Sequence, residues 1–91
     1  MEKEGISIAV SDKDGRVVVL FDYRRYNVNA SDIDDEITTA VIQGDISYVD
    51  LEHLDYGFIY LYYNSAYIDW TKAKNTATNI AEKIKGKEIR A

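Results

Sequence analysis

Tyr56-Gly57-Phe58-Ile59-Tyr60-Leu61-Tyr62-Tyr63 is the stretch that decides the fold. Six large apolar or aromatic residues follow the glycine without a polar break, which is typical of a strand that needs cover on both faces. Successive side chains of a strand point to opposite faces, so Phe58, Tyr60 and Tyr62 would share one face. Ile59, Leu61 and Tyr63 would share the other. A chain of 91 residues has enough helix to cover one face well, so we expect the second face to bind a partner.

Residues 6–23 predict a β-hairpin that precedes this strand. Residues 6–10 alternate apolar and small side chains, which is typical of a half-buried strand. Residues 11–15 have turn chemistry, and Gly15 can adopt the positive φ that a tight turn requires. The return strand is apolar on both faces between Val17 and Phe21, which favours a place next to the centre of the sheet.

A first helix is expected to begin near residues 29–34. Asn29 or Ser31 can cap the free backbone amides, and Val28 with Ile33 fits a hydrophobic staple. One apolar stripe would face the core, and Gly44 would end the helix; the stripe contains Ile33, Ile37, Ala40 and Val41.

The second half of the chain repeats this order of strands followed by a helix. Residues 46–52 read as an edge strand, and residues 53–57 as the turn into the opening stretch. The last helix would end at Gly86 and carry a stripe of Ala66, Trp70, Ala73, Ala77, Ile80, Ala81 and Ile84. Ile68 lies off this stripe, so either the helix begins at Ser65, or residues 66–69 form a short strand and the helix begins at Thr71.

The expected fold is therefore a single α+β domain over residues 1–91 in the order ββα-ββ(β)α. Its mainly antiparallel sheet would have four or five strands, with two helices packed on one face. This order resembles the longin and roadblock class of small α/β domains. The resemblance rests on the hairpin at residues 6–21 and on the strand at residues 57–63, which leads into a helix with regularly spaced alanines. The resemblance covers nearly the whole chain and implies adaptor, scaffold or GTPase-associated roles, commonly as dimers. The segment 46–55 is short for the strands that longin domains usually have there.

Composition limits the function classes. The net charge of −5 is divided into −8 over residues 1–55 and +3 over residues 56–91, and a negative domain repels a phosphate backbone. The chain has no cysteine, no apolar run of membrane-span length and no signal-peptide pattern after Met1, so we expect a cytoplasmic protein. Low Met and Gln with abundant Lys, Glu, Ile and Tyr is typical of thermophile and archaeal proteins.

The sequence predicts no catalytic, cofactor or metal site. His53 cannot form a zinc site alone, and no acid pair is placed around it in a recognisable motif. An acidic run consists of Asp32, Asp34, Asp35 and Glu36, and Asp45 could join it. The run could bind a cation, but it lacks the glycine and the spacing of a calcium loop. It better fits the capped start of a helix, where the helix dipole favours negative charge. Arg24-Arg25-Tyr26 could clamp a carboxylate or phosphate, or simply be a solvated strand end.

Eight tyrosines in 91 residues are the strongest functional signal. Tyrosine on a sheet can pack in the core, bind protein or stack nucleic-acid bases, and the negative charge disfavours the last of these. We therefore predict a non-enzymatic adaptor or small subunit that dimerises or docks on a larger protein through its sheet. The expected contact residues are Tyr23, Phe58, Tyr60 and Tyr62, and the alternative is that the opposite face of the sheet is the exposed one. The alternative is an accessory subunit or inhibitor of a nucleic-acid enzyme, viral or archaeal, in which Asp32, Asp34, Asp35, Glu36 and Asp45 mimic phosphates.

Overall fold

The computed structural model describes residues 2–3, 5–11, 13, 15–43, 46–63 and 70–89. Its elements are β1 (Glu2–Lys3), β2 (Ile6–Ser11), β3 (Arg16–Phe21), the 3-10 turn η1 (Ala30–Asp32), α1 (Asp34–Ile42), β4 (Tyr48–Asp50), the 3-10 turn η2 (Leu54–Tyr56), β5 (Phe58–Tyr62) and α2 (Trp70–Lys85). The predicted α+β class and the order of strands and helices are confirmed.

All neighbouring strands of the sheet are antiparallel, in the order β1-β2-β3-β5-β4. The two apolar runs noticed in the sequence are the central pair, β3 and β5, with Val17 opposite Leu61 and Val19 opposite Ile59. Segment 46–52 supplies the edge strand β4, as predicted. Apart from the two-residue strand β1, the chain thus consists of two ββα halves that meet where β3 of the first half pairs with β5 of the second.

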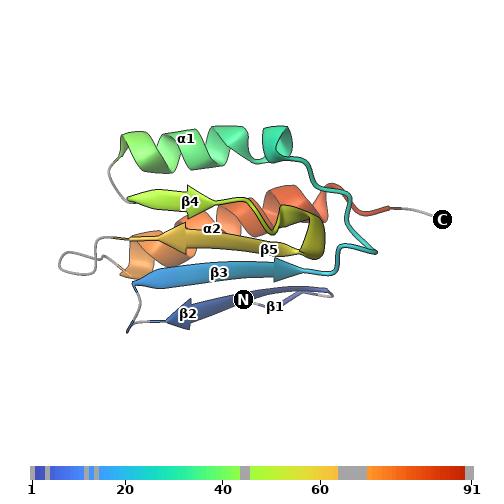
Figure 1. The fold of residues 1–91 in the computed structure, drawn as a ribbon, viewed down its shortest axis with the longest axis horizontal. Helices are drawn as coiled ribbons and strands as arrows, with labels where there is room; N and C mark the ends of the chain where they lie inside the picture. The colour runs from blue at the N-terminus through green and yellow to red at the C-terminus, as the bar shows by residue number, and fades with distance from the viewer. Residues whose placement is uncertain are drawn as a thin grey trace.

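The core lies on the face of the sheet that carries Val17, Val19, Ile59 and Leu61, all of which are fully buried. In Figure 1, α2 runs behind the sheet, and α1 lies beside β4 at its edge. Helix α2 contacts β2 and β3, which belong to the other half of the chain, and it also contacts α1. Each half therefore needs the other to bury its apolar surface.

The alanine-rich stripe explains how closely α2 approaches the sheet. Its predicted members within the described helix are buried, namely Ala73, Ala77, Ile80, Ala81 and Ile84, while Trp70 is half-buried against the same core. Tyr63 continues β5 and is also buried, and its hydroxyl donates to the carbonyl oxygen of Ala73 at 3.3 Å. Residues 64–69 lie outside the described residues, so the choice between the two predicted helix starts is unresolved there; the described helix begins at Trp70.

One detail of the first helix differs from the sequence expectation. Val41 was assigned to the buried stripe of α1, but half of its surface is exposed, and only Ile33, Ile37 and Ala40 face the core. At 100° per residue Val41 lies about 40° beyond Ile37 and about 100° from Ala40, outside the narrow arc between Ala40 and Ile37 that this short edge helix buries. Gly44 lies outside the described residues, and α1 ends at Ile42.

Candidate functional site

The face of the sheet opposite the helices carries alternate residues of β2, β3, β5 and β4, and the residues from β2 are Ser7, Ala9 and Ser11. We call the part of it on β3, β5 and β4 the open face, and its members are Arg16, Val18, Leu20, Tyr48, Asp50, Phe58, Tyr60 and Tyr62. Tyr48 is exposed and the other members are half-buried. The predicted division of the opening stretch into an outward set and a core set is therefore confirmed, with Phe58, Tyr60 and Tyr62 in the outward set.

Aromatic rings form a continuous row along this face. The centroids of Phe58 and Tyr60 lie 6.2 Å apart with an interplanar angle of 11°, and those of Tyr60 and Tyr62 lie 6.5 Å apart with an angle of 23°. Tyr48 extends the row onto β4, with its ring 5.7 Å from that of Tyr62. The row follows from the strand repeat, because residues two apart on one face are about 6.6 Å apart. Rings that cover each other in this way are half-buried without any covering helix.

Arg16 places a cation against the aromatic row. Its guanidinium carbon lies 5.4 Å from the ring centroid of Tyr60 and 6.0 Å from that of Tyr62, within the range of cation–π attraction. Such contacts contribute roughly 0.5–1 kcal/mol each at exposed sites. The open face therefore combines large rigid aromatic side chains with an arginine, which are the residue types that contribute most to binding at protein interfaces.

Tyr23, the fourth predicted contact residue, does not belong to this row. It lies in the turn after β3 with 53% of its surface exposed, and its ring contacts the guanidinium of Arg24 at 6.0 Å. Arg24 in turn hydrogen-bonds Asp22 through both its backbone N–H and its side chain, which lowers the pKa of the Asp22 carboxyl. Since β3 ends at Phe21, Tyr23 lies outside the sheet and is not aligned with the rings of β5.

The other two residues of the Arg24-Arg25-Tyr26 cluster, Arg25 and Tyr26, contact the segment that follows α2. Arg25 forms an ion pair with Glu88 at 3.0 Å and stacks over the ring of Tyr26, which is buried. Tyr26 and Glu88 also form an isolated antiparallel bridge. These contacts assign the cluster a structural role instead of the anion clamp considered from sequence.

The acidic run occupies the start of the first helical segment. The backbone N–H of Asn29 donates to the carboxylate of Asp32 at 2.8 Å, and Lys87 lies 3.2 Å from the same carboxylate. These two contacts lower the pKa of Asp32. Asp34, Asp35 and Glu36 lie in the first turn of α1, where the helix dipole favours negative charge. Asp45 lies outside the described residues.

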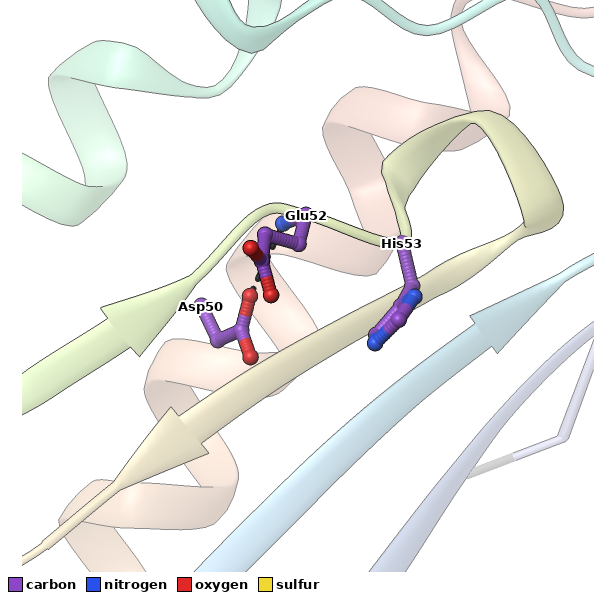
Figure 2. Close-up of side chains that lie close together, drawn as sticks. All are labelled: Asp50, Glu52 and His53. Atoms are coloured by element: carbon purple, nitrogen blue, oxygen red, sulfur yellow. Dashed lines mark hydrogen bonds between the residues drawn. The ribbon is translucent and has the colours of Figure 1, made fainter.

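A cluster of metal-ligand type lies at the end of β4, beside the open face. Ligand atoms of Asp50, Glu52 and His53 all lie within 4.8 Å of one another. Figure 2 shows the three side chains above β5, with the backbone N–H of Glu52 donating to Asp50 Oδ1 at 2.8 Å. The His53 ring meets that of Tyr60 edge-on, with centroids 5.8 Å apart.

This cluster corrects the sequence analysis, which found no acid pair around His53. The signal was the short spacing Asp50-Leu51-Glu52-His53 at the end of the expected edge strand. Strand β4 ends at Asp50, and Glu52 and His53 lie in the turn that follows it. The sequence placed a turn at residues 53–57, but it did not reveal that this turn brings the imidazole close to the two acids.

No protein-family model, no curated protein and no solved structure matches this chain. Among the residues described, none of the helices combines the length and apolar character that crossing a membrane requires.

Proposed function

We propose that this chain is a non-enzymatic protein-binding module that docks through its open face. The observation that carries the proposal is the row Phe58–Tyr60–Tyr62–Tyr48 with Arg16 against it, on the sheet face that neither helix of Figure 1 covers. Tyrosine and arginine supply large contact area and polar tips at low entropic cost, so a partner that buries them gains affinity.

A second copy of the chain is the partner that the charges favour. Arg16 and Asp50 lie on the same face, on different strands. A twofold interface brings each patch against its own symmetry mate, so Arg16 of one copy can approach the acidic end of β4 in the other. The adaptor role implied by the longin and roadblock resemblance agrees with such a dimer and is part of the proposal.

The size of the face sets the expected affinity. Three strands about 4.8 Å apart and about five residues long at ~3.3 Å each give a projected area on the order of 250 Å². Stable interfaces bury about 800 Å² per partner, so protruding side chains and the flanking turns must also contribute buried surface. We therefore expect a weak, reversible dimer.

Sedimentation velocity across micromolar to millimolar protein concentrations tests the proposal, with wild type, Tyr62→Ala and Tyr56→Ala compared. Tyr62 lies in the aromatic row, whereas Tyr56 is an exposed tyrosine in η2 that does not take part in the row. The proposal expects reversible dimerisation that Tyr62→Ala abolishes and Tyr56→Ala leaves intact.

If the wild type is monomeric throughout, the same variants test a different protein partner by affinity capture from the native source. A partner retained by Tyr56→Ala and lost with Tyr62→Ala supports docking through this face. Equal capture by both variants, together with a monomeric wild type, would refute it. A steep loss of any complex with added salt would instead favour the acidic mimicry predicted as the alternative.

A further inference from the structure

We propose that Asp50, Glu52 and His53 bind a divalent transition-metal ion, for which Zn²⁺ is the matching probe. Two carboxylates and one imidazole are a ligand set of the kind found in zinc sites with open coordination positions. An imidazole and only three protein ligands fit Ca²⁺ poorly, because Ca²⁺ takes six to eight oxygens. This inference goes beyond the docking function and does not depend on it.

The distances allow coordination with small side-chain movements. Ligand atoms of a tetrahedral zinc site lie about 3.4 Å apart, since each is ~2.0–2.2 Å from the metal. The three ligand atoms here lie within 4.8 Å of one another, so each needs to move by only about 1 Å. Glu52 and His53 are exposed and Asp50 is half-buried, so rotation about side-chain torsions is open to them.

The backbone already orients one of the ligands. Because Asp50 Oδ1 accepts a hydrogen bond from the Glu52 N–H, its second oxygen is left to face the metal (Figure 2). Ligating carboxylates in metal sites are commonly held by such a second hydrogen bond. Tyr60 meets the other side of the site through its edge contact with His53.

The charge environment also favours a cation at this point. In the described part of the chain, Asp22, Asp32 and Glu88 each have an arginine or lysine within 3.2 Å. Over the same residues, Asp50 and Glu52 form no ion pair with a basic side chain, although their carboxylates lie side by side. The repulsion between these two adjacent carboxylates is therefore not offset by a lysine or arginine, and a bound divalent cation would offset it.

The test is calorimetric titration of untagged full-length protein with Zn²⁺, together with backbone amide NMR spectra in the presence of substoichiometric Mn²⁺. We expect one Zn²⁺ per chain and paramagnetic broadening that is strongest at residues 49–54 and Tyr60 and decreases with distance from them. Asp50→Asn keeps the oxygen that accepts from Glu52 and removes the charge. That variant and His53→Gln should each weaken Zn²⁺ binding at least tenfold, given that even outer-shell changes cost ~10–100-fold.

Asp55→Asn is the matched control, because it removes an exposed acid two residues beyond His53 and outside the cluster. It should bind Zn²⁺ with the affinity of the wild type. Tyr62→Ala should do the same, because that substitution is expected to weaken only docking through the open face. Absence of binding up to about 1 mM Zn²⁺, or equal affinity in wild type and His53→Gln, would overturn the proposal. Equal losses in Asp55→Asn and Asp50→Asn would also overturn it, because they would indicate non-specific attraction to negative charge.

Discussion

Replacing Gly57 by alanine should destabilise the protein more than any other glycine-to-alanine change compared here. Gly57 ends η2 with φ of 86°, a region that residues with a Cβ rarely adopt. A Cβ at this position would lie 2.0 Å from the carbonyl oxygen of Phe21, far inside van der Waals contact. That oxygen belongs to β3, the neighbour of β5, so the backbone and not a side chain would have to move.

The loss of unfolding free energy in Gly57→Ala has two separate causes. A left-handed conformation costs an L-residue roughly 1–2 kcal/mol. Displacing β5 from β3 also threatens the hydrogen bond from the Phe21 N–H to the Gly57 carbonyl, which is 2.8 Å long, and a lost backbone bond costs about 0.5–1.5 kcal/mol. The two costs together are about 1.5–3.5 kcal/mol, and a domain of this size loses about 4–8 °C in Tm per kcal/mol. We therefore expect a Tm lower by roughly 6–28 °C.

Urea denaturation followed by circular dichroism measures this cost, with Gly86→Ala as the control. Gly86 does not have positive φ, and the nearest atom to a Cβ there is the carbonyl oxygen of Lys83 at 3.4 Å, an ordinary contact. Gly86→Ala should leave the free energy of unfolding unchanged or raise it by up to ~1 kcal/mol, because alanine reduces the conformational entropy of the unfolded chain. A Gly57→Ala variant within about 0.5 kcal/mol of wild type would refute the reasoning.

Three further predictions concern the two faces of the sheet, the helix contact and the acidic cap. Leu61→Ala, which empties a fully buried site, should cost about 2–5 kcal/mol in urea denaturation, whereas Tyr62→Ala on the open face should cost clearly less; similar losses would contradict the assignment of the faces. Ala77→Leu should cost ~1–3 kcal/mol by overpacking α2 against the sheet, while Asn75→Leu on the exposed side of the same helix should stay within about 0.5 kcal/mol; equal unfolding midpoints would show that the helix can move away. The pKa of Asp32 is lowered in the folded protein from its usual 3.8, so its contribution is present at neutral pH and is lost as pH falls through the folded value. Asp32→Asn should be less stable than wild type at pH 7 and should lose less further stability on acidification to pH ~2; parallel curves of the unfolding free energy against pH would contradict this.

The fold was predictable because its decisive residues carry strong patterns. Tyr60 and Leu61 alternate between the two faces as a strand requires, and Ala73, Ala77 and Ile80 recur at helical spacing. Val41 was misplaced because spacing defines a stripe but not the width of the arc that a neighbouring element covers. Tyr23 is exposed but lies in the turn after β3, so its membership of the docking surface stays a prediction.

The cluster at Asp50, Glu52 and His53 could not be predicted as a site. Its three side chains come together because the chain turns directly after β4, at Glu52 and His53, before it enters η2. The position of that turn was predicted, but the directions of the side chains within it were not. The docking function and the longin and roadblock resemblance stay predictions. Topology alone does not determine function.

The meeting of β3 and β5 at the centre of the sheet also determines how the chain must fold. Val17 and Leu61 are opposite each other although 44 residues (61 minus 17) separate them in sequence. The β2–β3 hairpin can form early, but it has no covering helix until α2 arrives from the far half. Because loop-closure entropy is lost before these long-range contacts are gained, folding should be slow for a chain of this length and all-or-none. Amide hydrogens in both central strands should therefore exchange through the same global unfolding event, and neither ββα half should persist as a folded fragment.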